Sequence, residues 1–195
     1  MATGTDNFSE TDRAHMAAAL TLAGRGLGRV APNPAVGCVL VKDGMVVGRG
    51  WTQAGGRPHA ETEALARAGA AARGATAYVT LEPCSHRGRT PPCAEALVEA
   101  GVARIVAAME DPDPRVSGRG FARLREAGMA VETGLLEAEA RRLNLGFVLN
   151  RTEGRPLVTV KLATTLDGRI ATASGESRWI TGPQAREEAH LIRAR

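Results

Sequence analysis

Apolar and polar positions follow two different periods along the chain, one typical of strands and one typical of helices. Residues 36–41 and 45–51 are apolar runs separated by Asp43-Gly44, a dipeptide that is the strongest short signal for a β-hairpin. Later apolar runs predict three further strands, at residues 75–81, at residues 104–109 and near Val131.

Amphipathic stretches with helix-start and helix-stop residues lie before and between these strands. Ser9, with Asp12 three residues later, predicts a capped helix that runs to about Gly24. Pro58 is expected to open a helix that reaches about Ala72, because proline suits the first helical position. The alternation of strands and helices predicts an α/β fold with a mixed sheet between helices. Further helices are expected at residues 92–100, 118–127 and 136–149.

A polar stretch at residues 151–155, which contains Gly154, predicts a domain boundary. We therefore expect one domain over residues 1–150 and a second segment over residues 156–195, which we take to be the incomplete start of another domain. In that segment the pattern predicts a strand, a turn and a helix start, in that order at residues 157–163, at Asp167-Gly168 and at Pro183.

Composition and charge narrow the class of protein. The chain has 195 residues, of which 44% are hydrophobic and 3% aromatic, so its core must be built from aliphatic side chains. The net charge of +4 comes from scattered basic residues without long runs, which does not favour nucleic-acid binding. Three cysteines without an apolar leader argue against a disulfide framework, and no window approaches a membrane span of about 18 apolar residues. We expect a cytoplasmic protein that does not bind membranes.

One imidazole, two thiols and one carboxylate lie close together in the sequence, at His59, Cys84, Cys93 and Glu61. One histidine and two cysteines suit zinc and leave a fourth position open for water. Glu61, two residues from the histidine, is a natural proton carrier in such a site. The set therefore predicts a zinc-water hydrolase that acts on an amino-substituted base.

Two other interpretations of these residues stay open. A structural zinc site would need a fourth protein ligand, for which Cys38 and His86 are the candidates. Alternatively, the residues could hold no metal at all. Cys38 lies in an apolar run, where a small buried thiol is ordinary.

Several motifs of this chain match those of one enzyme family. They are PNPAVGCV, PHAE, TLEPCSHRGRTPPC, GRG, KLATTLDGR and SGESRWIT, at residues 32–39, 58–61, 80–93, 118–120, 161–169 and 174–181. On these motifs the chain resembles the bifunctional riboflavin-biosynthesis pyrimidine deaminase-reductases. Nucleic-acid and cytidine deaminases usually place two residues between their cysteines, whereas Cys84 and Cys93 are separated by eight, as in the riboflavin family.

The resemblance implies a cytidine-deaminase-like three-layer αβα sandwich with a mixed sheet, followed by the beginning of a dihydrofolate-reductase-like domain. It implies zinc-dependent hydrolytic deamination of 2,5-diamino-6-ribosylamino-4(3H)-pyrimidinone 5′-phosphate to 5-amino-6-(5-phosphoribosylamino)uracil. In the full-length family a reductase domain then reduces the ribosyl group with NADPH, a step that we do not expect of this chain. The implied cofactors are therefore Zn²⁺ and, in the full-length family, NADPH.

The resemblance also implies roles for particular residues of the deaminase part. His59, Cys84 and Cys93 correspond to zinc ligands, and Glu61 corresponds to the proton shuttle. Substrate-contacting positions correspond to Asn33, Arg89, Asp111 and Asp113. Read alone, residues 111–114 could equally form a plain turn, and Arg89 could simply cover its loop.

In the reductase part, five positions match residues to which the family gives a role. Lys161, Ala163 and Trp179 correspond to cofactor-contacting residues, and Ser177 and Arg193 correspond to substrate-contacting residues.

The chain departs from the family at two positions, Thr52 and Asp113. The family often has asparagine where this chain has Asp113 and histidine where it has Thr52, and both positions bear on substrate contacts. The implied partner is a small-molecule pyrimidine ribonucleotide rather than nucleic acid. The resemblance is also compatible with a homo-oligomer. A zinc deaminase of nucleic-acid bases and a non-catalytic zinc-stabilised module are the alternatives.

Overall fold

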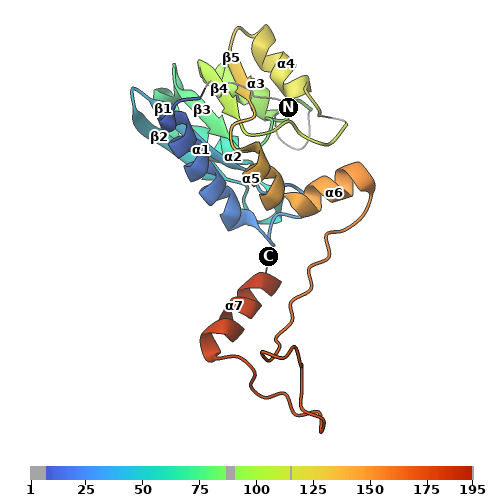
Figure 1. The fold of residues 1–195 in the computed structure, drawn as a ribbon. Coiled ribbons are helices and arrows are strands. Elements are labelled where there is room, and N and C mark those ends of the chain that lie inside the picture. The colour runs from blue at the N-terminus through green and yellow to red at the C-terminus, as the bar shows by residue number, and fades with distance from the viewer. Residues whose placement is uncertain (1–7, 87–90, 115, 195) are drawn as a thin grey trace. The chain divides into compact units, whose positions relative to one another are not determined.

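A mixed five-stranded sheet organises the first of two compact units, Met1–Pro156 and Leu157–Arg195. The computed structural model describes residues 8–86, 91–114 and 116–194. The strand order is β2-β1-β3-β4-β5 (Figure 1), in which β1 pairs antiparallel with β2 and β3, whereas β3, β4 and β5 run parallel. The strands are β1 (Gly37–Lys42), β2 (Met45–Trp51), β3 (Thr76–Val79), β4 (Arg104–Ala107) and β5 (Ala130–Thr133).

The predicted hairpin is present between β1 and β2. Lys42 pairs with Met45, so Asp43 and Gly44 form a two-residue loop, with φ of 50° and 74° respectively. Positive φ at both positions is typical of a type I′ turn, whose twist matches that of the strands it joins. The loop therefore sets the register in which β1 and β2 pair.

Helices cover both faces of the sheet, which gives three layers (Figure 1). A Cβ added at Gly37 of β1 would overlap the backbone of α1 (Glu10–Ala23), and one added at Gly50 of β2 would overlap that of α2 (Ala60–Ala68). Gly50 pairs with Cys38, the neighbour of Gly37, so these two helices pack on opposite faces. Glycine at both positions allows each helix to contact the sheet backbone closely.

The remaining helices of this unit enclose an aliphatic core. They are α3 (Cys93–Glu99), α4 (Arg119–Glu126), α5 (Glu137–Leu143) and α6 (Leu145–Glu153), with short 3₁₀ turns at Gly24–Gly26, Ala54–Gly56 and Gly69–Ala72. The largest fully buried side chains include Met16, Leu40, Leu97, Ile105, Met109, Leu124 and Leu135. The core is thus made mainly of aliphatic and sulfur-containing side chains, as the low aromatic content predicts.

The expected helix at residues 136–149 is instead two helices, α5 and α6, that meet at Asn144. The side chain of Asn144 accepts a hydrogen bond from the Ala35 backbone N–H (2.8 Å) and donates one to the Ala35 carbonyl (2.9 Å). Its backbone leaves the helical conformation, with φ −101° and ψ 22°. α6 then continues to Glu153, through most of the stretch that we expected to be a linker.

The helix that we expected Pro58 to open begins two residues later, at Ala60. His59 is the N-cap residue, with extended φ and ψ of −72° and 161°, rather than a residue of the first turn. The helix ends at Ala68, and the 3₁₀ turn that follows reaches Ala72. Because an N-cap residue is half outside the helix, the imidazole can point away from the helix axis.

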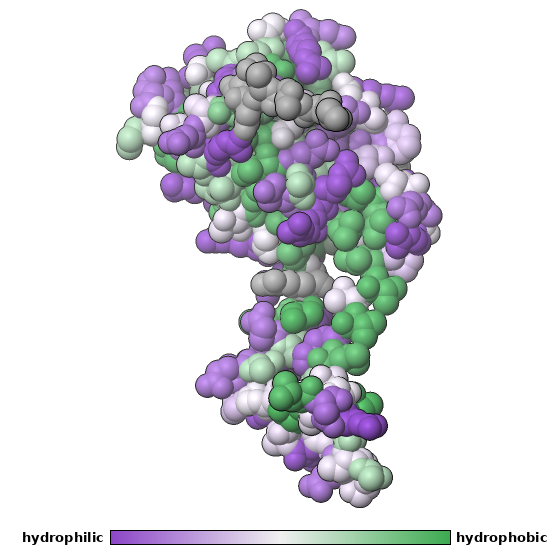
Figure 2. All heavy atoms as spheres, viewed as in Figure 1, coloured by the Kyte–Doolittle hydropathy of each residue, from purple (hydrophilic) through white to green (hydrophobic). Residues whose placement is uncertain are grey.

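The second unit contains α7 (Pro183–Arg193), which begins at the predicted proline, but not the strand that we expected at residues 157–163. A strand needs a neighbouring strand for its backbone hydrogen bonds, and none pairs with these residues in the described part of the chain. Most of the exposed large apolar side chains belong to this unit (Figure 2), among them Val158, Val160, Leu162, Leu166 and Ile170. Among the described residues, no helix is long and apolar enough to cross a membrane.

A charged network joins the start of α1 to three strands of the sheet. Ser9 and Asp12 form the predicted capping box, which is confirmed. Asp12 also accepts hydrogen bonds from the Tyr78 hydroxyl and the Arg104 guanidinium, both at 2.7 Å, and Arg104 in turn contacts Glu132 at 2.7 Å. Burial alone would raise the pKa of Asp12, but the hydrogen bonds from Arg104, Tyr78 and Ser9 outweigh it and hold that pKa far below its usual value.

Asp12→Asn should therefore lower the free energy of unfolding near neutral pH by about 1.5–3 kcal/mol, the range for hydrogen bonds to charged groups. The folded-state pKa of Asp12 lies below its unfolded value, so this stabilisation is present above about pH 4 and decreases as the pH falls further. Urea unfolding at several pH values measures the difference, with the exposed Glu99→Gln as the control. A difference between wild type and Asp12→Asn that stays constant below pH 4 would contradict this assignment.

Candidate metal centre and substrate pocket

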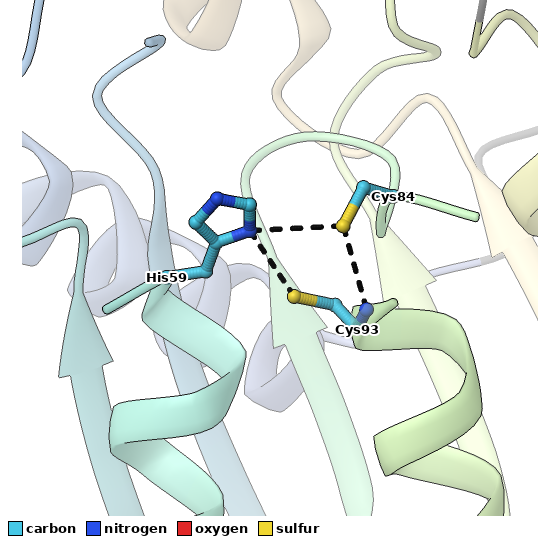
Figure 3. A group of neighbouring side chains, drawn as sticks. All are labelled: His59, Cys84 and Cys93. Carbon is cyan, nitrogen blue, oxygen red and sulfur yellow. Dashed lines mark hydrogen bonds between the residues drawn. The ribbon is translucent and has the colours of Figure 1, made fainter. Parts of the chain in front are cut away.

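Three segments bring His59, Cys84 and Cys93 together at one end of the sheet. His59 precedes α2, Cys84 lies in the loop after β3, and Cys93 is the first residue of α3. The three side chains point toward one another (Figure 3), and their ligand atoms all lie within 4.8 Å of one another. The structure therefore assembles the three residues that the sequence predicts as a metal site.

The distances in this cluster fit a tetrahedral zinc ion. His59 Nδ1 lies 3.3 Å from the Cys93 sulfur and 3.6 Å from the Cys84 sulfur. Zinc bonds of about 2.3 Å to sulfur and 2.0–2.1 Å to nitrogen would separate such ligands by about 3.5 Å. Neither Cys38 nor His86 joins this group among the described residues, which favours a site with an open fourth position over a structural zinc site.

Hydrogen bonds link the thiols and the imidazole of this cluster and shift their pKa values. A hydrogen bond from the Cys93 thiol lowers the pKa of Cys84 to about 4, and hydrogen bonds from His59 and the Cys93 backbone N–H contribute. The same hydrogen bond raises the pKa of Cys93, and the hydrogen bond to Cys84 raises the pKa of His59. A metal ion at this place would replace the protons of these hydrogen bonds, because thiolate and neutral imidazole are the forms that bind metal.

Glu61 lies in the first turn of α2 and lines the same cavity as the cluster. Its side chain is 3% exposed, and it is not part of the group of close metal-ligand atoms. Burial raises the pKa of its carboxyl to about 7, and the charge of Cys84 adds to this effect. A carboxyl group with these properties can carry a proton near neutral pH.

The cavity next to the cluster has a volume of about 130 Å³, enough for several water molecules. Its walls come from several separate segments of the first unit. Asn33 lines it and donates a hydrogen bond to the Gly56 carbonyl (2.8 Å), and Thr52 lines it and accepts one from the Val36 N–H (3.0 Å). Other lining residues include Arg57, Leu81, Glu82, His86, Asp111, Asp113, Val116, Phe147 and Arg151.

Asp111 and Asp113 are both buried and both line the cavity, so the segment is more than an exposed turn. The Asp113 N–H donates a hydrogen bond to the Asp111 carboxylate at 2.8 Å. Burial raises the pKa of Asp111 to about 6, and the nearby charges of Asp113 and Glu82 add to it. Arg89, the fourth substrate contact that we expected, lies outside the described residues.

Sequence analysis gave no role to Glu82, which holds this acidic wall in place. Its buried carboxylate accepts hydrogen bonds from the backbone N–H groups of Asp111 (3.1 Å), Gly118 (2.9 Å) and Gly120 (2.8 Å). A Cβ at Gly120 would overlap the Pro83 carbonyl, so glycine is required for this close approach. The signal available in the sequence was a carboxylate next to Pro83 and a GRG motif, without any indication that they meet.

Sequence analysis also missed Arg151, because it lies in the polar stretch that we expected to be a linker. The structure places it in the last turn of α6, where its Nε lies 3.6 Å from an Asp113 carboxylate oxygen. Its guanidinium also lies over the ring of Phe147, 5.3 Å from the ring centroid. No local pattern marks this arginine, since its partner is distant in sequence.

Two of the five predicted reductase residues line one depression of the second unit. Ser177 and Trp179 line a shallow depression, and the Arg186 guanidinium lies 4.3 Å from the Trp179 ring centroid. Lys161, Ala163 and Arg193 are not among the residues that line it. The roles expected for these five residues stay predictions.

Comparison with known proteins agrees with this geometry. Residues 9–109 match the family model of the cytidine and deoxycytidylate deaminase zinc-binding region, and residues 156–195 match that of the RibD C-terminal domain. The riboflavin biosynthesis protein RibD of Escherichia coli is 58% identical over 183 residues, which are 94% of this chain and 50% of that protein. The chain thus spans about half the length of the relatives it matches.

Solved structures show the same similarity. Acinetobacter baumannii RibD is 53% identical, with a TM-score of 0.87 over 95% of this chain and 52% of that one. A deaminase/reductase from Thermotoga maritima, described as acting on diaminohydroxyphosphoribosylaminopyrimidine and 5-amino-6-(5-phosphoribosylamino)uracil, is 44% identical, with a TM-score of 0.89 over 94% of this chain and 53% of that one.

These matches confirm the family resemblance, the cytidine-deaminase-like fold and the Zn²⁺ cofactor that the sequence predicts. The chain belongs to the cytidine and deoxycytidylate deaminase zinc-binding family, and it is similar to bacterial RibD proteins along nearly all of its length.

Proposed function

We propose that this chain is a zinc-dependent deaminase of riboflavin biosynthesis. Its reaction would convert 2,5-diamino-6-ribosylamino-4(3H)-pyrimidinone 5′-phosphate and water into 5-amino-6-(5-phosphoribosylamino)uracil and ammonia. The observation that carries the proposal is the close cluster of His59, Cys84 and Cys93, with the buried Glu61 in the same cavity. The similarity to the Thermotoga maritima deaminase/reductase supports the choice of substrate.

Each residue near the cluster has a separate role in this proposal. His59, Cys84 and Cys93 would hold Zn²⁺, which when bound supplies a Lewis acid that activates water. Glu61 would take one proton from the water and deliver it to the ring nitrogen. It would then transfer the second proton of the added water to the departing amine, which leaves as ammonia. Asn33, Asp111 and Asp113, together with Arg89, would contact the substrate.

We also propose which kinds of molecule this chain binds. We propose that a small pyrimidine ribonucleotide binds at this cavity, and that neither nucleic acid nor membrane binds. A cytoplasmic location and a homo-oligomeric assembly stay predictions. Ammonia release from the free pyrimidine nucleotide, compared with single-stranded RNA, tests the substrate class, and deamination of the RNA would favour the alternative of a nucleic-acid deaminase.

We further propose that residues 1–150 form the deaminase domain and that residues 156–195 form the first part of a reductase domain. The match of residues 156–195 to the RibD C-terminal domain supports this division. Lys161, Ala163 and Trp179 would then belong to an NADPH site, and Ser177 and Arg193 to its substrate site.

The first test concerns metal content. The purified chain should contain close to one zinc, and Cys84→Ser should lose most of it because serine does not supply a thiolate at neutral pH. Elemental analysis measures both, with Cys38→Ala as the matched control, since Cys38 is the third cysteine and lies outside the cluster. Full zinc occupancy in Cys84→Ser, or its loss in Cys38→Ala, would contradict the assigned ligands.

The second test concerns proton transfer. Glu61→Gln should keep zinc and the fold but lower kcat by about 10²–10⁴-fold, the range for general acid–base steps. Ammonia release and zinc content are measured on the same sample. Glu63→Gln is the control, because Glu63 lies in the same turn and pairs with Arg67 instead. Turnover at the wild-type rate by zinc-loaded Glu61→Gln would rule out the proton shuttle.

The third test concerns reduction. Because the described residues 157–194 contain one helix and no paired strand, we expect no substrate-dependent oxidation of NADPH. The measurement uses the deaminated pyrimidine as substrate and runs beside an ammonia assay on the same protein. NADPH oxidation that depends on this substrate would show a complete reductase site and would refute both the expectation and our domain boundary.

A further inference from the structure

We propose that Arg151 is a positioning residue of the substrate pocket, which orients the side chain of Asp113 through an ion pair between a half-buried arginine and a buried carboxylate. The inference rests on the proposed deaminase function, because it gives Asp113 a substrate-binding role. It goes beyond that function by adding a residue of α6 to the pocket.

The position of Arg151 supports such a role. It lies in the last turn of α6 and lines the same cavity as His59 and Glu61. Its Nε lies 3.6 Å from Oδ2 of Asp113, whose side chain is 8% exposed. A basic residue in the last turn of a helix also interacts favourably with the helix dipole.

The guanidinium of Arg151 lies near both Phe147 and Asp113. Phe147, four residues earlier on α6, places its ring centroid 5.3 Å from the Arg151 guanidinium carbon. The Nε–H of Arg151 is buried and makes no hydrogen bond in the described structure, although it lies near Asp113. A buried donor of this kind would gain a hydrogen bond from a small movement toward the Asp113 carboxylate.

The acidic lining of the cavity explains why a cation beside Asp113 would matter for substrate binding. Four acidic side chains line it, those of Glu61, Glu82, Asp111 and Asp113. Two arginines, Arg57 and Arg151, line it as well, and Arg151 lies beside Asp113. A buried carboxylate next to others is unfavourable unless a cation compensates it. A positive charge beside Asp113 would favour its carboxylate form, and Arg151 is such a charge. An ionised carboxylate only accepts hydrogen bonds, so it would recognise amino or ring N–H groups of an aminopyrimidine.

The backbone around Asp113 is fixed independently of Arg151. The Asp113 carbonyl accepts hydrogen bonds from the N–H groups of Val116 (2.8 Å) and Ser117 (3.0 Å), and Glu82 holds the preceding Asp111. Removal of the guanidinium should therefore change the orientation of the Asp113 side chain without unfolding the backbone that carries it.

A double-mutant cycle in the zinc-loaded chain tests the pair. Arg151→Met should raise KM for the pyrimidine nucleotide by about fivefold or more, between the scales for exposed and for buried charge pairs, and change kcat less. In an Asp113→Asn background, the same change should alter KM by less than about threefold, because the carboxylate charge that Arg151 compensates is then absent. Arg142→Met, on an exposed position of α5, is the matched control.

Thermal unfolding of the same proteins gives a second measurement that does not depend on activity. Arg151→Met should lower Tm by a few degrees, and this decrease should disappear in the Asp113→Asn background. Arg151→Lys keeps the charge but loses the planar guanidinium, so it should give an intermediate KM.

Three results would overturn the proposal. Arg151→Met could behave like Arg142→Met in both KM and Tm, or its effects could be the same with and without the Asp113→Asn substitution. The effect of Arg151→Met on KM could also vanish with the unphosphorylated ribonucleoside, which would show that Arg151 binds the phosphate directly. If the wild type releases no ammonia, the proposed function fails, and the cycle in Tm still decides whether the two residues are coupled.

Discussion

The buried carboxylate of Glu82 is the interaction on which the geometry of the pocket depends. Its two oxygens accept hydrogen bonds from backbone N–H groups 29 to 38 residues later, in the segment that begins with Asp111 and leads into α4. Cys84 follows two residues after Glu82, so the residue that anchors the segment of Asp111 lies close in sequence to a predicted metal ligand. Loss of this carboxylate would leave several backbone donors buried without partners, which costs about 1–3 kcal/mol each.

Much of the fold could be predicted because its signals are local. The type I′ loop at Asp43-Gly44 and the capping box at Ser9 each involve residues at most three apart, and both are present. The break at Asn144 could not be predicted, because the hydrogen bonds that favour it come from Ala35, 109 residues away. Likewise, the apolar pattern at residues 157–163 predicts a strand but cannot supply a neighbouring strand to pair with it.

The candidate site also contains some residues that could be predicted from the sequence and others that could not. His59, Cys84 and Cys93 have side chains whose chemistry points to metal even before their distances are known, so the sequence could identify them. Glu82 and Arg151 are ordinary charged residues whose roles come only from what they face in the folded chain. The region of Arg151 was predicted to be a linker, because polar residues next to glycine are common both in linkers and at the ends of helices.

The closeness of the two sulfurs has a consequence for the protein without metal. The Cys84 and Cys93 sulfurs lie within 4.8 Å of each other, and Cys84 has a strong tendency to ionise. A thiolate beside a second thiol is open to oxidation to a disulfide, a reaction that a bound metal ion blocks by occupying both sulfurs. Metal loss under oxidising conditions would thus be difficult to reverse by adding zinc alone, and a reductant would be needed to recover the site.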